Sequence, residues 1–213
     1  MTGYLAAVAA LARKDLRLEL RARDTLPAML LFVLATLVVF HFALPADVGD
    51  DPAYGLLWVA LVFTSLLGLA RAWVPEREAG ALDGLVLAPT DRSAIWLGKT
   101  IASLAFLGAA EVVALPAFVL FFAPLDAHAL AGVVLASVGI CAVGSLVSAM
   151  AAASRGREVL LPLIFLPLAI PIVVGGVGAS ISEEPAKFLA FLGLYDAVFA
   201  ILSWAAFEYV VTE

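Results

Sequence analysis

The sequence predicts an all-α, polytopic membrane protein with six transmembrane helices that follow an interfacial helix. Composition is the first observation behind this prediction. Hydrophobic residues make up 64% of the 213 residues and charged residues 14%, whereas a soluble domain is about half apolar and about a quarter charged. So short a chain cannot bury this much apolar surface in a water-soluble core, and the excess is expected to face lipid. The second observation is that positive and negative side chains are segregated along the chain.

The chain begins with a predicted amphipathic helix over Tyr4–Asp24. Its apolar residues recur near helical spacing and are Leu5, Val8, Ala12, Leu16 and Leu20. Its basic residues are Arg13, Lys14, Arg17, Arg21 and Arg23. This pattern favours a helix that lies in the cytoplasmic interface; a solvated helix with an accidental stripe is the alternative. A cleavable signal peptide is disfavoured, because the charged region is too long and the apolar run that follows exceeds a usual signal core.

The predicted spans follow in order. A helix needs roughly 20 apolar residues to cross the hydrocarbon core of a bilayer. The windows that meet this requirement are Thr25–Leu44, Tyr54–Trp73, Leu97–Phe122, His128–Ala153, Val159–Val177 and Phe188–Val211. Residues 1–213 are therefore expected to form a single transmembrane domain, in which residues 25–211 hold the spans.

The distribution of Lys and Arg predicts the orientation, because cytoplasmic loops carry an excess of both. Eleven of the twelve precede the first span or lie around the connections after the second and fourth spans. The other connections hold Asp47, Asp50, Asp51, Asp126, Glu183 and Glu184, with Lys187 as the exception. We therefore expect both termini, Val74–Trp96 and Ser154–Glu158 on the cytoplasmic side of the inner (cytoplasmic) membrane.

No pattern in the sequence predicts an enzyme active site. A phosphate-binding loop ending in Gly-Lys-Ser/Thr and a His-Glu-x-x-His metal motif are both absent. Cys141 is the single cysteine and lies in an apolar run, so it is expected to be a packing residue, without a disulfide or a cysteine-based metal site.

Three groups of residues inside the spans are candidates for function. Glu111 and Asp196 are carboxylic acids in predicted spans, where such groups face a bundle interior or a cavity. Each is either part of a substrate path or a buried, hydrogen-bonded carboxyl group. Pro167 and Pro171 interrupt the fifth span and predict a hinge. The two histidines, which are His41 and His128, fall near the outer ends of spans and are either polar caps or ligands for a metal or haem iron.

The connection after the second span is the most informative segment. It begins with acidic residues, continues with leucines three apart and stops at Pro89, which predicts a short amphipathic helix on the cytoplasmic face. The residues expected to couple this segment to a partner are Glu76, Arg77, Glu78, Gly80, Leu82, Asp83, Leu85 and Pro89. An ordinary interfacial loop is the alternative.

This segment resembles the coupling region of ABC-2-type transporter permeases, and the whole chain resembles the CcmB family of bacterial cytochrome c maturation. The residues that carry the second resemblance are Gly55–Val59, Arg71, Gly80–Pro89, Lys99 and Leu166–Pro171. The resemblance implies an ABC-2-type permease fold and a non-catalytic membrane subunit for haem delivery or export. Gly84 stands where a larger residue is commoner, and Glu111 has no counterpart in the family pattern.

The resemblance also implies partners. CcmB-like proteins work with the ATPase subunit CcmA, with CcmC and CcmD, and with the haem chaperone CcmE. ATP would then act through CcmA only, and haem would be a cargo rather than a covalently bound cofactor. A homodimer bound to two ATPase copies is expected, with a CcmB–CcmC heterodimer as the alternative. Two other functions stay open: a permease for a drug, lipid or glycan, and a non-transporting scaffold.

Overall fold

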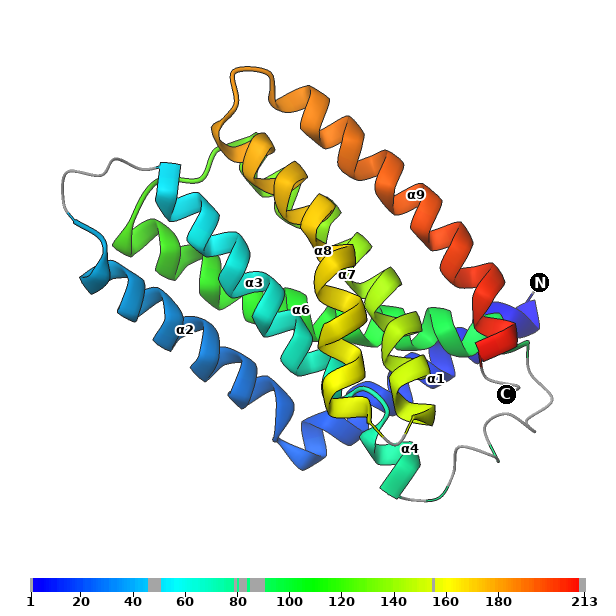
Figure 1. The fold of residues 1–213 in the computed structure, drawn as a ribbon. Helices are drawn as coiled ribbons and strands as arrows, with labels where there is room; N and C mark the ends of the chain where they lie inside the picture. The colour runs from blue at the N-terminus through cyan, green and yellow to red at the C-terminus, as the bar shows by residue number, and fades with distance from the viewer. Residues whose placement is uncertain are drawn as a thin grey trace.

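The computed structural model describes residues 2–45, 51–78, 80, 84, 91–154 and 156–210. The described part of the chain is a helical bundle without strands (Figure 1). Its helices are α1 (Thr2–Ala22), α2 (Thr25–Ala43), α3 (Asp51–Arg71), α4 (Val74–Glu78), α6 (Arg92–Phe121), α7 (Ala127–Ala153), α8 (Arg157–Ile181) and α9 (Pro185–Val210). Six of these helices are long and apolar enough to cross a membrane, which confirms the predicted fold class.

Five helices extend beyond their predicted spans, and of these α7 begins one residue early, at Ala127, and α9 three residues early, at Pro185. α3 begins at Asp51 rather than Tyr54, and α6 begins at Arg92 rather than Leu97. α8 continues past residue 177 to Ile181. The hydropathy pattern marks only the apolar part of a helix, whereas capping residues determine where the helix starts. At α6 the Asp91 carboxylate accepts a hydrogen bond from the Ser93 N–H at 3.0 Å, which fixes the first turn.

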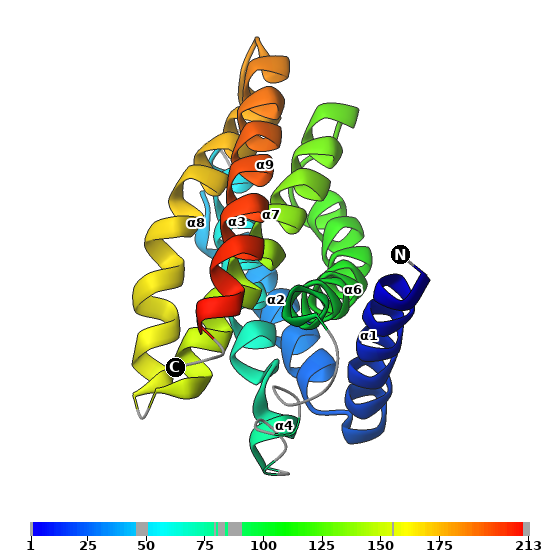
Figure 2. The same ribbon diagram turned by 90° about the vertical axis from the view of Figure 1, so that its right-hand side faces the viewer.

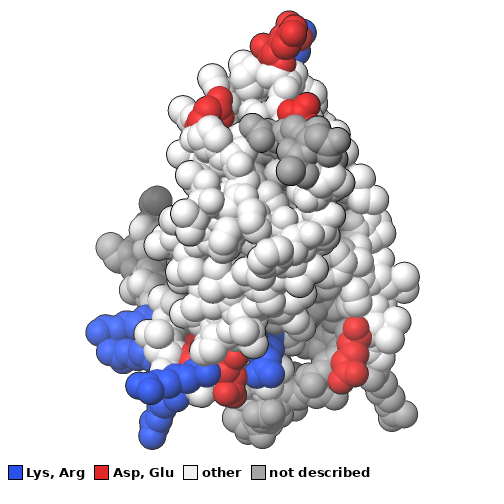
Figure 3. All heavy atoms as spheres, turned by 90° about the vertical axis from the view of Figure 1, so that its left-hand side faces the viewer, with Lys and Arg blue, Asp and Glu red and all other residues white. Residues whose placement is uncertain are grey.

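The spans run between two chemically different ends of the bundle. Figure 1 shows the end of α2, the start of α3 and the connections α6–α7 and α8–α9 at one end, here called the acidic end. α1 begins and α9 ends at the opposite end, here called the basic end, where α1 lies across the spans (Figures 1 and 2). On the face in Figure 3 a broad uncharged belt separates the charged side chains of these ends. Such a belt is what the hydrocarbon core of a membrane requires.

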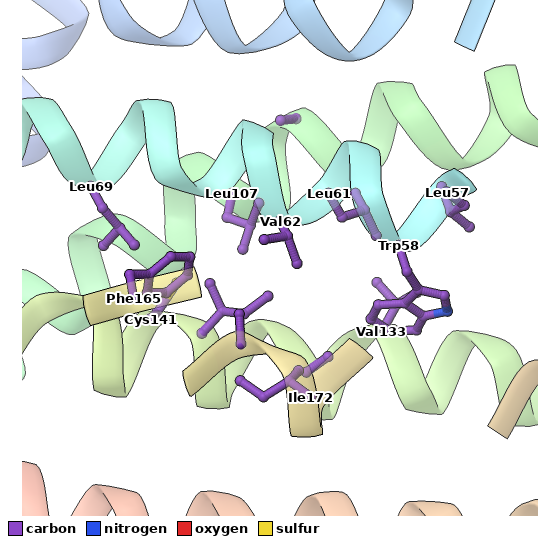
Figure 4. Close-up of a cluster of buried hydrophobic side chains, with 14 of the residues drawn as sticks. Leu57, Trp58, Leu61, Val62, Leu69, Leu107, Val133, Cys141, Phe165 and Ile172 are labelled. Carbon is purple, nitrogen blue, oxygen red and sulfur yellow. The ribbon is translucent and has the colours of Figure 1, made fainter. Parts of the chain in front are cut away.

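The core is a seam of apolar side chains between α3, α7 and α8. Leu57, Trp58, Leu61, Val62 and Leu69 of α3 lie along this seam with Val133 and Cys141 of α7 and Phe165 and Ile172 of α8 (Figure 4). Cys141 is a packing residue, as expected. Glycine makes the closest approaches possible, since the Trp58 ring occupies the space that a Cβ at Gly176 would need.

α8 stays helical through its prolines. Pro162, Pro167 and Pro171 all lie inside the helix, so they do not divide this span in two. Figure 1 shows that α8 changes direction along its length. Prolines explain such a bend, because each one removes a backbone donor and crowds the preceding turn. The Tyr195 hydroxyl of α9 donates a 2.7 Å hydrogen bond to the Leu168 carbonyl within this proline-rich stretch.

Candidate functional site

Four charged side chains meet at the basic end of the bundle. They are Lys14 and Asp15 of α1, Glu76 of α4 and Lys99 of α6, here called the ion cluster. Glu76 and Lys99 are each only 4% exposed. Buried charges are costly unless they are paired, and each member of the ion cluster has a partner of opposite sign.

Lys99 is the centre of the ion cluster. Its ammonium group lies 2.8 Å from Glu76 Oε1 and 3.1 Å from Asp15 Oδ2. It also donates a 2.6 Å hydrogen bond to the Ala72 carbonyl, one residue beyond the end of α3. The same nitrogen lies 4.8 Å from the centre of the Trp73 ring, a cation–π distance. One side chain of α6 therefore fastens α1, α4 and the end of α3.

Lys14 completes the ion cluster from the surface of α1. It donates to Glu76 Oε1 and lies 3.1 Å from Asp15 Oδ1. Burial alone would lower the pKa of Lys14, but the hydrogen bond to Glu76 and the charge of Asp15 outweigh it, so this pKa is raised above its ordinary value. Lys14 is therefore firmly cationic at neutral pH.

Close packing of α1 on α6 brings the charges together. A Cβ added at Gly98 would lie 2.8 Å from the Leu11 Cβ, so only glycine allows the two helices this approach. Tyr4 and Ser93 share a 3.1 Å hydrogen bond farther along the same contact. The interfacial helix expected from the sequence is therefore docked against a span rather than held by lipid alone.

The ion cluster adjoins the predicted coupling segment. α4 contains Glu76, Arg77 and Glu78, and Gly80 has a φ of +61°, a conformation that suits glycine. The remaining predicted coupling residues, which are Leu82, Asp83, Leu85 and Pro89, lie outside the described residues, as do the side chains of Arg77 and Glu78.

One expectation for this segment is corrected. Glu76 was expected to be a surface residue that couples this segment to a partner, but its carboxylate is buried and pairs with Lys14 and Lys99 of its own chain. The sequence gives no signal for these pairs, because Lys14 is 62 positions away.

A cleft of about 490 Å³ opens beside the ion cluster, between α3, α4, α7 and α8. Its walls are largely apolar, with Trp73, Leu161 and Pro162 among them, and Arg71 and Glu158 supply the charged groups. A cleft with apolar walls and a few polar groups is typical of sites for small molecules.

The two carboxylic acids in the spans both lie at helix interfaces. The Ser137 hydroxyl of α7 lies within hydrogen-bond distance of the Glu111 carboxyl group of α6 and 2.8 Å from the Val133 carbonyl, and its single proton is donated to one of these acceptors at a time. Asp196 of α9 packs against Gly139 on α7, and neither of its oxygens has a hydrogen-bond partner among the described residues. Both groups are buried, which favours the interpretation as interface carboxyls over an open substrate path.

The two histidines lie at the acidic end in different surroundings. His41 Nδ1 lies 2.9 Å from the Phe121 carbonyl and its ring is surrounded by phenylalanines. His128 Nδ1 lies 3.2 Å from Asp126 Oδ2 in the first turn of α7. Among the described residues, no group of three or more His, Cys, Asp and Glu side chains is placed to hold a metal ion.

Comparison with known proteins agrees with this architecture. The family model for the CcmB protein matches residues 6–211. The chain belongs to the CcmB family. The "Heme exporter protein B" of Bradyrhizobium diazoefficiens is 29% identical over 182 residues, which cover 83% of this chain and 82% of the relative. The "Heme exporter protein B" of Paracoccus denitrificans is 28% identical, over 92% of this chain and 95% of the relative. That of Pseudomonas aeruginosa is 31% identical, over 79% of this chain and 78% of the relative.

Membership in the CcmB family fits the helical bundle. A multi-pass membrane subunit of a transporter is expected to have apolar spans, and the described residues supply them. The resemblance drawn from Gly55–Val59, Lys99 and Leu166–Pro171 is therefore confirmed.

Proposed function

We propose that this CcmB-family chain is the membrane permease subunit of a haem-export complex that serves the maturation of c-type cytochromes. The match of the family model over residues 6–211 carries the proposal. In this role the chain hydrolyses nothing itself. A separate ATPase, CcmA, supplies the energy, and the complex with CcmC and CcmD releases the haem-loaded chaperone CcmE.

The proposed orientation places the basic end in the cytoplasm of a bacterium and the spans in its inner membrane. The excess of Lys and Arg at that end supports it. The segment that docks the ATPase then lies on the cytoplasmic side, between α4 and α6, where the ATPase operates.

The coupling segment transmits the motion of the ATPase in this proposal. It begins within α4, which ends at Glu78, and the chain reaches Asp91, the cap of α6, after it. The ion cluster links α4, through Glu76, and α6, through Lys99, to α1 and to the end of α3. A displacement of the segment is therefore delivered to several helices at once. The leucines Leu82 and Leu85 are the expected anchors in an apolar groove of the ATPase, and Glu78 contributes a peripheral charge.

Copurification of the ATPase tests this role. Truncation of a central apolar anchor typically costs about 2 kcal/mol or more, whereas a peripheral charge costs less. Leu85→Ala is therefore expected to retain less CcmA than Glu78→Ala, and cytochrome c production should fall in parallel. Leu82→Asp combined with Leu85→Asp should abolish retention. Full CcmA retention by a stably expressed double variant would disprove the docking role.

The stoichiometry is a separate part of the proposal. An ATPase of this kind binds ATP between two copies, and each copy needs a docking surface, so we expect two copies of this chain for two of CcmA. Native mass spectrometry of the complex measures the ratio directly. One copy for two ATPases would instead favour a heterodimer with CcmC.

A further inference from the structure

A histidine with a defined tautomer lies at the acidic end of the bundle. His41 is in the last turn of α2, and its Nδ1 is 2.9 Å from the carbonyl oxygen of Phe121, the last residue of α6. A carbonyl oxygen only accepts hydrogen bonds, so Nδ1 carries the proton and donates it. The lone pair is then on Nε2, which has no hydrogen-bond partner among the residues that the structure describes.

This arrangement is the one that metal-binding histidines use. A ligating imidazole usually donates its other N–H to a carbonyl or carboxylate, which fixes the ring and makes the ligating nitrogen more basic. The His41 side chain is exposed, so a ligand can reach Nε2 from outside the bundle.

The surroundings of His41 suit a flat, apolar ligand. Its ring centre lies 5.2 Å from that of Phe121, 5.4 Å from that of Phe42 and 5.8 Å from that of Phe122. Phe42 is 83% exposed, and Val38 and Val39 expose further apolar surface on the preceding turn of α2. The exposed Phe42 ring and the partly buried rings of Phe121 and Phe122, beside an oriented imidazole, offer a porphyrin both a ligand for its iron and contacts for its ring.

We propose that His41 is an axial ligand of haem iron, and that Phe42, Phe121 and Phe122 hold the porphyrin beside it. The inference rests on the proposed function for the presence of haem and on the proposed orientation for its position at the outer face of the membrane. An Fe–Nε2 bond forms and a weak ligand such as water leaves, so no change of oxidation state is required. His128 does not share the role, because its Nδ1 faces the Asp126 carboxylate and no aromatic contact to its ring exists within the described residues.

Spectroscopic titration of the full chain in lipid nanodiscs with haemin tests the assignment. The wild-type chain should give a saturable Soret shift typical of imidazole-ligated haem. His41→Gln keeps a side-chain donor for the Phe121 carbonyl but removes the imidazole, so it should weaken binding by about tenfold or more, as losses at metal sites do. His128→Gln is the matched control, since it removes the only other histidine, and it should bind like the wild type.

Two further variants separate ligation from packing. In His41→Gly, free imidazole should restore the imidazole-type spectrum, which a merely structural role for His41 would not allow. Phe42→Ala should weaken haemin binding while the spectrum of the bound form stays the same. Equal affinity and identical spectra for the wild type and His41→Gln, or no saturable binding by the wild type, would overturn the assignment.

The outcome is independent of the docking test. A chain that retains CcmA but binds haemin without His41 contradicts this inference and leaves the proposed function intact. A chain that binds haemin through His41 but retains no CcmA contradicts the coupling role alone.

Discussion

Lys99→Met is the sharpest test of the ion cluster, because it removes one charge and keeps an unbranched side chain of similar length. The lost contacts are those to the Ala72 carbonyl at 2.6 Å, to Glu76 at 2.8 Å and to Asp15 at 3.1 Å. Two largely buried carboxylates then share Lys14 alone. Removal of one partner from a buried ion pair costs about 3–5 kcal/mol, and the continued presence of Lys14 places the expected loss at the lower end, about 3 kcal/mol of unfolding free energy.

Unfolding in mixed micelles with increasing SDS measures this loss, and tryptophan fluorescence follows it. Trp73 is a suitable reporter because its ring lies 4.8 Å from the Lys99 nitrogen. Lys187→Met is the matched control. Lys187 pairs with Glu184 at the exposed acidic end, and an exposed pair contributes less than about 1 kcal/mol.

A double variant separates the ion pair from packing. Adding Glu76→Gln to Lys99→Met removes the carboxylate that Lys99 neutralised, so the combined loss should be smaller than the sum of the single losses by about 1 kcal/mol or more. If Lys99→Met unfolds at the same SDS fraction as Lys187→Met, Lys99 does not hold the basic end together.

Three other measurements test the arrangement of the helices. Gly98→Val should destabilise the chain by about 1–3 kcal/mol, because even a Cβ would lie 2.8 Å from the Leu11 Cβ, whereas Gly108→Ala, with open space around it, should not. Asp126→Ala should cost about 1 kcal/mol at neutral pH, because Asp126 Oδ1 accepts from the Ala129 N–H. That hydrogen bond lowers the pKa of Asp126 in the folded protein. The stability that the bond adds is therefore fully present above the pKa that Asp126 has in the unfolded chain, and it is lost as the pH falls through the lower pKa of the folded protein. The unfolding free energies of the wild type and Asp126→Ala, measured over a pH series, should therefore become equal in acid. Cysteines placed at Asp50 and Glu183 should react with an impermeant maleimide added outside intact cells, and protection of both would reverse the orientation.

The sequence predicts the spans well because span formation depends on local composition. A run such as Thr25–Leu44 is apolar enough to be recognised without knowledge of its neighbours, and the structure places α2 over Thr25–Ala43. Helix ends are less predictable, since Asp91 as the cap of α6 depends on one side-chain hydrogen bond. The family resemblance was likewise accessible, because its residues are distributed over nearly the whole chain.

Pairing between distant residues could not be predicted from the sequence. Glu76 looked like a surface charge because it begins a polar connection, yet Lys99 lies 23 positions away and reaches it from another helix. The surroundings of His41 depend on Phe121, 80 positions away. Hydropathy and helical period describe one segment at a time, so they cannot show which polar side chains meet.

α6 connects the two candidate sites directly. Its first turn is capped by Asp91, where the coupling segment returns, and its last carbonyl orients His41. Its 30 residues span roughly 45 Å at 1.5 Å per residue. A helix transmits displacement along its axis better than a loop does, because its turns are hydrogen-bonded to one another, and in α6 only Pro116 lacks the backbone donor for such a bond. Under the proposed function, the ATPase moves the ion cluster, and α6 carries that movement to the Phe121 carbonyl and so to the His41 imidazole.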